Sequence, residues 1–316
     1  MTADKKSVCS SEVEKRWRGI SRRRSKRPGF AGLAALLLAG CATTATQAPV
    51  KQPVSSAHPA APPKGMQWLY GSGEAAATSI QGYRAFRDHV LAAIKSRPRN
   101  SVVLAEGATL AAPRWVPCGN RPFAVVLDVD ETVLQNLGYE YDEAITGRSF
   151  DSARWQRWER TGADKVAPIP GAVTALRALR QAGVTVIYNT NRESIHAAQT
   201  ADALNRNGLG PVKHRETLWL AGDVGQGSAK DARRAAISER YCVVAMAGDQ
   251  LGDFSDLFNA KTLQVRERRE AAGRGDYAAM WGAGWFMFAN PVYGPSIRGD
   301  FDEVFPADRQ WRDPGE

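Results

Sequence analysis

The 316-residue chain contains 43% hydrophobic, 24% charged and 9% aromatic residues. This composition excludes a disordered, fibrous or multi-span membrane protein and predicts a globular domain. The formal net charge of +9 is concentrated at the N-terminus, because residues 1–40 hold ten Lys or Arg against three acids. The other residues carry 32 basic and 30 acidic side chains, a net charge of only +2. We therefore do not expect a nucleic-acid polymer as a partner.

The N-terminal region has the parts of a bacterial export signal in the expected order. The basic stretch RRRSKRPG precedes the apolar run FAGLAALLLAG, which is shorter than the roughly 20 residues that a membrane-spanning helix needs. The run ends in the sequence LAGC, which resembles the lipobox of bacterial lipoproteins and implies that Cys41 is lipidated. We predict a lipoprotein signal peptide over 1–40 and attachment to a membrane through lipid at Cys41.

Residues 41–65 are expected to form a flexible tether. Their sequence is rich in Ala, Thr, Pro and Ser and has no hydrophobic period, so it cannot bury enough surface to offset the entropy lost on ordering. Ala42 stands where an aspartate commonly retains lipoproteins in the inner membrane. We therefore expect a cell-envelope lipoprotein, at the outer membrane where the cell has one.

The sequence from 66 to 316 predicts a single α/β domain. An amphipathic helix is expected over 66–95, and residues 111–122 are expected to form a loop. Short apolar runs predict strands at 123–127, 184–188, 217–220, 243–247 and 285–288, and three- and four-residue apolar spacing predicts helices at 172–181, 194–206 and 229–240. This alternation predicts a Rossmann-like parallel sheet with helices on both faces, preceded by an N-terminal helical extension.

Acidic and polar side chains follow three of the predicted strands, and a lysine begins a predicted helix. They are Asp128 and Asp130 after the first strand, Thr190 and Asn191 at the second, Asp249 and Asp253 after the fourth, and Lys230. Ligands of open parallel sheets bind beyond the carboxyl ends of the strands. We therefore expect these side chains to form one site.

These residue types have defined uses in phosphoryl transfer. Asp128 can attack phosphorus, and Asp130 can protonate the leaving oxygen and then activate water. The charge on the phosphoryl oxygens must also be neutralised, which calls for a cation and for donors such as Lys230 and Thr190. Asp128 and Asp249 suit Mg²⁺, a hard ion that binds few carboxylates and keeps several waters. For Asp253, helix capping and metal contact are both open.

Several segments together resemble a known family. The sequence DVDET at 128–132, with Thr190, Lys230 and GDQLGD at 248–253, is similar to the four motifs of the haloacid-dehalogenase-like (HAD-like) superfamily. The lipobox, the segment WLYGSGEAAATSIQGYRAF at 68–86 and ANPVYG at 289–294 resemble the bacterial class C acid phosphatases.

The resemblance implies a function and a set of site residues. It implies a Mg²⁺-dependent acid phosphatase that hydrolyses phosphomonoesters, such as nucleotides or other small organic phosphates, through an aspartyl-phosphate. The implied metal site holds four aspartates, and the implied phosphate contacts come from three further residues. These are Asp128, Asp130, Asp249 and Asp253 at the metal, and Thr190, Asn191 and Lys230 at the phosphate.

Residues 135–170 are expected to form a cap over the site. Tyr139 and Tyr141 lie near the first motif and are the better candidates for contact with a substrate ring, together with Tyr293. Trp155 and Trp158 have helical spacing and are expected in the core of the cap.

Two alternatives stay open. Cys118 and Cys242 precede strands that are neighbours in the superfamily that this chain resembles, and a disulfide and two free thiols are equally expected. The second candidate function is a surface lipoprotein that has lost catalysis and acts as a binding module. Such a protein would be expected to lose Asp128 or Asp130, and both are present. No pattern in the sequence fixes an oligomeric state.

Overall fold

The computed structural model describes residues 59, 61–225 and 227–315. The predicted signal peptide, Cys41 and most of the predicted tether lie outside these residues. Within the described part of the chain, no helix has both the length and the apolar character needed to cross a membrane.

The N-terminal extension consists of two helices, where the sequence predicts one. These are α1 (Lys64–Gly71) and α2 (Gly73–Ser96). They are separated by Ser72, which has extended backbone and whose Oγ accepts a hydrogen bond from Ala75 N at 3.0 Å. Ser72 therefore caps α2 and ends the continuous helix that the apolar spacing predicts.

A hairpin precedes the main sheet. β1 (Asn100–Leu104) pairs in antiparallel orientation with β2 (Trp115–Pro117), within a stretch that was expected to contain a loop. β2 is only three residues long and ends in proline, which is why its sequence has the character of a loop. Val102 and Val103 of β1 are buried, and Trp285 Nε1 donates a hydrogen bond to Val102 O at 2.8 Å.

The central sheet has five parallel strands in the order β7-β6-β3-β8-β9. All five match predicted strands. Their bounds are β3 (Phe123–Leu127), β6 (Thr185–Glu193), β7 (Leu218–Ala221), β8 (Cys242–Gly248) and β9 (Trp285–Met287). β6 extends five residues beyond its predicted end, and this extension carries Thr190, Asn191 and Arg192.

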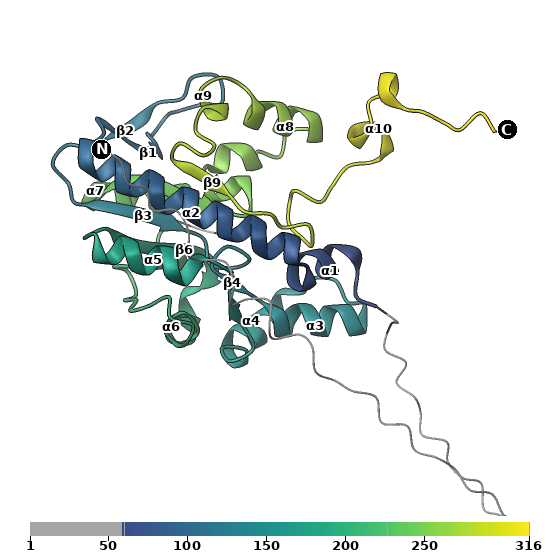
Figure 1. Ribbon diagram of the computed structural model, residues 1–316, viewed down its shortest axis with the longest axis horizontal. Helices are drawn as coiled ribbons and strands as arrows, with labels where there is room; N and C mark the ends of the chain where they lie inside the picture. The colour runs from purple at the N-terminus through teal and green to yellow at the C-terminus, as the bar shows by residue number, and fades with distance from the viewer. Residues whose placement is uncertain (1–58, 60, 226, 316) are drawn as a thin grey trace, which may run out of the picture. The chain divides into compact units, whose positions relative to one another are not determined.

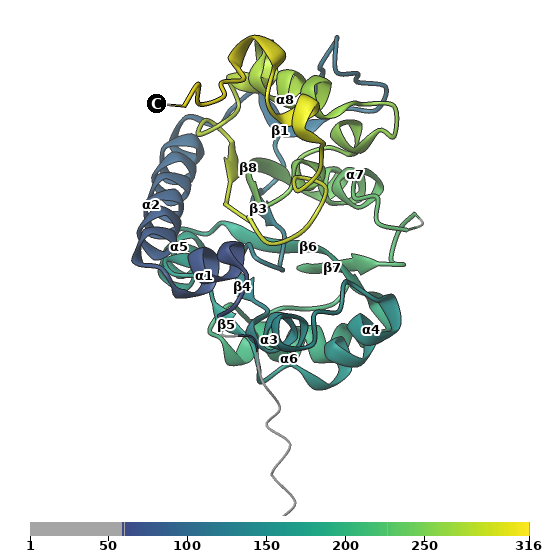
Figure 2. The same cartoon turned by 90° about the vertical axis from the view of Figure 1, so that its right-hand side faces the viewer.

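Helices cover both faces of the sheet, as predicted (Figures 1 and 2). Val125 and Leu127 of β3 join a core with residues of α2, α5 (Ala172–Gln181) and α6 (Ala197–Arg206). The alternate residues Ala124 and Val126 join a second core with Ile237 of α7 (Asp231–Arg240). The C-terminal part adds α8 (Val265–Gly273), α9 (Gly275–Ala278) and α10 (Phe301–Val304).

A separate cap is inserted between β3 and α5. The short strands β4 (Leu134–Gln135) and β5 (Ala167–Pro168) pair in antiparallel orientation at its base. Between them lie α3 (Leu137–Thr146) and α4 (Ser152–Thr161), which Figure 2 shows side by side below the sheet. The insertion corresponds to the cap expected over 135–170.

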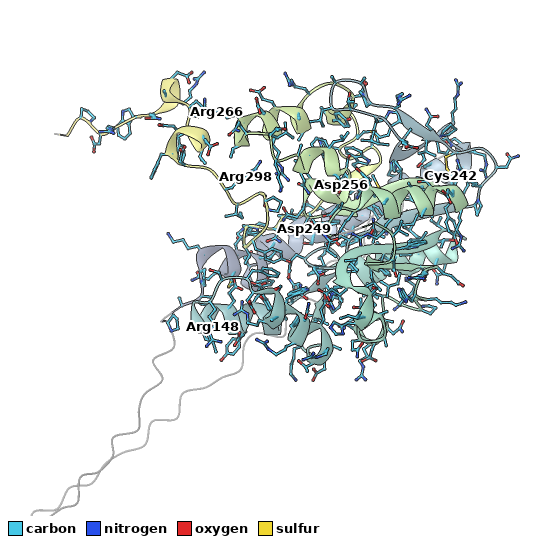
Figure 3. The ribbon with its side chains drawn as sticks, turned by 180° about the vertical axis from the view of Figure 1, so that it is seen from behind. Arg148, Cys242, Asp249, Asp256, Arg266 and Arg298 are labelled. Carbon is cyan, nitrogen blue, oxygen red and sulfur yellow. A yellow bond between two sulfur atoms is a disulfide. The ribbon has the colours of Figure 1, made fainter. Side chains whose placement is uncertain are left out.

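Cys118 and Cys242 form a disulfide with their Cα atoms 4.7 Å apart. The parallel register pairs Phe123 with Cys242, so Cys118 reaches its partner because residues 118–122 fold back. In this turn Arg121 N donates to Cys118 O at 3.4 Å. The structure thus favours the bridge over two free thiols. Figure 3 shows Cys242 and Asp249 at opposite ends of β8.

Candidate active site

Three carboxylates gather at the carboxyl edge of the sheet. Asp128 follows β3, and Asp249 and Asp253 follow β8, the neighbouring strand. Each offers an oxygen, and these three oxygens all lie within 4.8 Å of one another. Asp128 N donates to Ala247 O at 3.0 Å, which extends the pairing of the two strands to the nucleophile position. The parallel topology therefore brings together residues that are more than 100 positions apart.

Lys230 lies between two of these carboxylates. Its Nζ donates to Asp128 Oδ1 at 2.5 Å and to Asp253 Oδ1 at 2.7 Å. All three residues are less than a tenth exposed. Burial would lower the pKa of Lys230, but the two carboxylates outweigh it and raise that pKa above its ordinary value. Lys230 is therefore a fixed positive charge in the site.

The cluster remains short of positive charge. Three ionised carboxylates and one ammonium leave two uncompensated negative charges. Burial raises the pKa of Asp128, and the nearby Asp253 and Asp249 carboxylates raise it further against the effect of Lys230. Burial and Asp253 likewise raise the pKa of Asp249 to about 6. A hard divalent cation fits this all-oxygen, doubly negative donor set.

Asp249 and Asp253 are held in position by hydrogen bonds from segments that follow three different strands, β3, β8 and β9. Asp249 Oδ1 accepts from Thr132 Oγ1 at 3.0 Å, and Asp249 Oδ2 accepts from Asn290 Nδ2 at 2.9 Å. The main chain of Gln250 donates to Asp253 Oδ2 at 2.9 Å. A Cβ at position 248 would lie 2.3 Å from that of Asp253, so the turn requires Gly248.

Asp130 is in a different environment from the other three aspartates. Its carboxylate lies outside the group of three described above, and its predicted place at the metal stays a prediction. Arg192 donates to Asp130 Oδ1 from Nε at 3.0 Å and from Nη2 at 2.7 Å, and Asn136 Nδ2 donates to the same oxygen at 2.9 Å. Burial raises the pKa of Asp130, but the Arg192 guanidinium outweighs burial and lowers it.

Of the three predicted phosphate contacts, Asn191 and Lys230 line the cavity, whereas Thr190 is buried and is not among the lining residues. Thr190 is fully buried, and its Oγ1 donates to Asp130 Oδ2 at 3.3 Å. Asn191 lines the cavity above the site, and its Oδ1 accepts from Arg233 Nη2 at 2.6 Å. Lys230 lines the same cavity. Arg233 and Asn136 were not singled out by the sequence, because nothing in their local pattern distinguishes them from ordinary polar residues. Asn290 lies in the ANPVYG segment that carries part of the resemblance, but no role was assigned to it.

A cavity of about 630 Å³ lies between this edge of the sheet and the cap. Its lining includes Tyr139 and Tyr293, as expected of substrate contacts, together with Phe150. Tyr141 is 61% exposed and is not among the lining residues, so its predicted contact with substrate is not supported by its position. Trp155, expected in the cap core, also lines the cavity.

The difference between the two tryptophans follows from packing. Trp158 lies against Gly138 and Gly162, where an added Cβ would come within 2.9 Å or less of its ring, and it is not among the lining residues. Trp155 instead packs edge-on against Tyr139, with ring centroids 4.9 Å apart. Helical spacing alone does not separate the two, because α4 has one face on α3 and an adjacent face on the cavity.

Comparison with known proteins agrees with this architecture. The family described as "HAD superfamily, subfamily IIIB (Acid phosphatase)" matches residues 82–296. The chain is 29% identical over 132 residues, 40% of its length, to acid phosphatase 1 of Solanum lycopersicum, and it spans about half the length of that curated relative.

Two solved structures have a similar fold. The class C acid phosphatase from Bacillus anthracis aligns with a TM-score of 0.59 and 26% identity, covering 73% of this chain and 84% of that one. A second structure of a class C acid phosphatase from Bacillus anthracis, with tungstate bound, aligns with a TM-score of 0.60 and 24% identity, covering 76% and 92%. Since the family match extends over more than half of the chain, the protein belongs to the acid phosphatase subfamily IIIB of the HAD superfamily.

Proposed function

We propose that the protein is a Mg²⁺-dependent acid phosphatase that hydrolyses phosphomonoesters, such as nucleotides or other small organic phosphates, through an aspartyl-phosphate. The observation that carries this proposal is the buried group of Asp128, Asp249 and Asp253 with Lys230, at the floor of a cavity large enough for a small organic phosphate. The site retains a nucleophile and a second aspartate, which favours catalysis over the alternative of a binding module.

The residues divide the reaction as follows. An Asp128 carboxylate oxygen attacks phosphorus, and the bond from phosphorus to the ester oxygen breaks. Asp130 gives its proton to that oxygen, and the alcohol leaves. Water then attacks the aspartyl-phosphate, loses a proton to Asp130, and releases phosphate and free Asp128. Lys230 stabilises negative charge on the phosphoryl oxygens throughout.

Asp128, Asp249 and Asp253 are the residues that would hold the cation. When bound, a divalent cation supplies charge neutralisation at the phosphoryl oxygens. Thr132, Asn290 and Gln250 fix Asp249 through hydrogen bonds, so the chain itself orients part of this donor set.

Asp130 must be protonated to act as an acid, although Arg192 lowers its pKa in the ligand-free site. A phosphate dianion beside Asp130 adds negative charge, which raises the pKa of this carboxyl group again. Proton uptake by Asp130 is thus coupled to binding of the substrate. This arrangement favours activity on the acidic side of neutrality.

The test is hydrolysis of p-nitrophenyl phosphate and of nucleoside monophosphates by the parent and by Asp128→Asn. The parent should release phosphate, should lose activity in EDTA and should recover it with Mg²⁺. Asp128→Asn should lose at least about a hundredfold in kcat, because an amide is a poor nucleophile. The exposed variant Glu239→Gln serves as the control. Activity of Asp128→Asn within tenfold of the parent would overturn the proposal.

We further propose that the enzyme is held at the cell envelope, at the outer membrane where one is present, through lipid on Cys41. The support is the lipobox at 38–41 and the polar tether that follows it. A Cys41→Ser variant should move to soluble envelope or medium fractions and keep its specific activity. Persistent tight membrane association of this variant would contradict the assignment of the anchor.

A further inference from the structure

We propose that Arg233 and Arg234, two consecutive residues of α7, are positioning residues that hold different halves of the active site. Arg233 holds the end of β6, where proposed phosphate contacts lie, and Arg234 holds the loop after β8, which would supply ligands to the cation. This inference rests on the proposed phosphatase function and concerns two residues that take no part in the chemistry described above. It predicts that binding of phosphate and binding of Mg²⁺ can be weakened separately.

Both arginines lie in the first turn of α7, within four residues of Lys230. Each is at most 1% exposed, and neither is among the described residues that line the cavity. A substrate in the cavity is therefore not expected to touch them. Buried guanidinium groups are rare unless their N–H groups are paired, so the acceptors of these groups indicate which part of the site each arginine holds.

Arg233 reaches the end of β6. Its Nη1 donates to Thr190 O, and its Nη2 donates to Asn191 Oδ1 at 2.6 Å and to Ala229 O at 3.1 Å. A guanidinium group can only donate, so the amide oxygen of Asn191 must face Arg233. The Nδ2 group of Asn191 is then the end that can donate to a phosphate oxygen in the cavity. Arg233 thus sets the orientation in which Asn191 serves phosphate as a donor.

Arg233 also places a positive charge beside this end of β6. Its acceptors are two carbonyl groups and one amide, and no ion pair in the described part of the chain includes it. Burial, and then the charge of Arg234, lowers the pKa of Arg233 to about 10 against the effect of Asp128, so the group stays charged at neutral pH. A buried cation without a paired carboxylate is unfavourable, and a phosphate dianion bound nearby offsets this cost. Binding of phosphate should therefore depend on Arg233.

Arg234 reaches the other half of the site. Its Nη1 donates to Gly252 O at 3.0 Å and to Asp253 O at 2.8 Å, so it holds the main chain of a residue whose carboxylate belongs to the donor set for the cation. Its charge is paired, because Nη2 lies 2.6 Å from Asp231 Oδ1 and 3.5 Å from Asp256 Oδ1. Replacement of Arg234 should therefore disturb the ligands of the cation.

Asp256 keeps Lys230 in place through bonds that do not involve Arg234. Its Oδ1 accepts from Lys230 N at 2.9 Å, and its Oδ2 accepts from Asp231 N at 2.7 Å. Asp231 Oδ2 accepts in return from Asp256 N at 3.0 Å. These bonds join the start of α7 to the segment that follows β8, so Lys230 should stay available to phosphate when Arg234 is replaced.

The experiment measures two dissociation constants by titration calorimetry, that of Mg²⁺ alone and that of inorganic phosphate at saturating Mg²⁺. The proteins are the parent, Arg233→Met, Arg234→Met and the exposed control Arg84→Lys, since methionine keeps a long side chain but removes the charge and the donors. Arg233→Met should weaken phosphate binding by about tenfold or more and keep the Kd of Mg²⁺ within about threefold. Arg234→Met should weaken Mg²⁺ binding by about tenfold or more and keep the Kd of phosphate within about threefold.

Opposite changes in the two variants are a result that a general structural role would not give. Equal losses of both affinities in each variant, or losses of neither, would overturn the inference. Where thermal unfolding shows that a methionine variant is not folded, Arg233→Lys or Arg234→Lys replaces it, and the same pattern is expected at about fivefold. Lysine variants that also fail to fold would mean that the arginines hold the fold rather than the site, which overturns the inference.

The proposed function is tested separately in the parent. Failure of the parent to hydrolyse p-nitrophenyl phosphate would overturn the proposed function and with it the roles assigned to both arginines. Hydrolysis by the parent, without separate effects of the two variants on phosphate and Mg²⁺ binding, would overturn this inference alone.

Discussion

Arg192 binds Asp130 through two N–H groups directed at one carboxylate oxygen, at 3.0 and 2.7 Å. Both side chains are largely buried, at 3% and 15% exposure, so solvent screens this ion pair little. Asn136 bridges the pair, since it donates to Asp130 and accepts from Arg192 Nη2 at 2.9 Å. The general acid of the proposed reaction is therefore oriented, and its ionisation controlled, by a residue that is not required to touch the substrate.

Replacing Arg192 should shift the pH dependence of kcat more than it lowers the maximal value of kcat. Arg192→Lys keeps a positive charge but loses the two-point contact, so the pKa of Asp130 should rise. Activity requires protonated Asp130, and a higher pKa preserves that form to higher pH. We expect the alkaline limb of kcat against pH to move upward by about one unit. The exposed variant Arg84→Lys is the control, and a limb that stays in place or moves downward would contradict the role of Arg192.

Divalent cations should stabilise the folded protein through the carboxylate group. Burial, and then repulsion from neighbouring aspartates, raises the pKa of Asp128 and Asp249, and a bound Mg²⁺ would offset the cost of both carboxylates. At a hundred times Kd, Mg²⁺ should add about 2.7 kcal/mol to the free energy of unfolding. Thermal unfolding with and without Mg²⁺ measures this effect. Asp249→Asn should lose most of the increase in Tm. An equal increase in Asp249→Asn and the parent would place the cation elsewhere.

Glu140 should cost the protein stability above neutral pH. Burial and Glu143 raise its pKa to about 7, against the opposing effect of Arg154. A raised pKa in the folded state means that the stability is fully present below the unfolded value of about 4.5 and is lost as the pH rises through 7. Glu140→Gln removes this dependence. The free energy of unfolding of Glu140→Gln relative to the parent should therefore rise between pH 5 and pH 8, by an amount on the order of 3 kcal/mol.

The prediction concerns only the difference in the free energy of unfolding between Glu140→Gln and the parent. Glu159 also has a pKa raised to about 7, but both proteins contain it, and its contribution cancels. Chemical denaturation at four or five pH values gives the difference directly. A difference that is constant with pH would mean that Glu140 is not an unpaired buried acid.

The disulfide should stabilise the fold without affecting the chemistry. It joins residues 124 positions apart, and the chain-entropy model gives about 4 to 5 kcal/mol for a loop of this length. Thiol titration of the denatured, unreduced Cys41→Ser protein, after removal of its signal peptide, should find no free thiol. Reduction should then lower the denaturation midpoint, while the kcat of the protein that remains folded at 25 °C stays unchanged. Two free thiols per chain would rule out the bridge.

The sequence predicted those parts of the fold that rest on local pattern. The apolar run 123–127 has no polar residue to interrupt it, and β3 occupies these residues. The hairpin of β1 and β2 was missed because its second strand is short and lies next to prolines, so that only its pairing with β1 defines it. The break at Ser72 was missed for a related reason, since helical apolar spacing continues across it while the serine caps the second helix.

In the site as well, the residues that belong to local motifs could be predicted from the sequence, and the contacts that depend on packing could not. Asp128, Lys230 and Asp249 belong to motifs with fixed order along the chain, so the sequence alone indicates that they meet. The contacts of Asp130 with Arg192 and Asn136 depend on where the cap begins relative to β6, which no local pattern encodes. The position of Trp155 on the cavity and that of Tyr141 in solvent likewise depend on how α3 and α4 pack together.

The N-terminal helices make hydrogen bonds to residues at the floor of the active site, so the smallest active fragment must include them. Tyr83 of α2 donates to Thr132 O at 2.6 Å, and the Thr132 hydroxyl in turn donates to Asp249. Gln135 Nε2 donates to Leu69 O of α1 at 3.3 Å. A shortened protein that starts at β1 would retain all four site aspartates and Lys230. It would lose the hydrogen bonds that Tyr83 and Leu69 make with Thr132 and Gln135. Expression for crystallography or enzymology should therefore begin before Lys64.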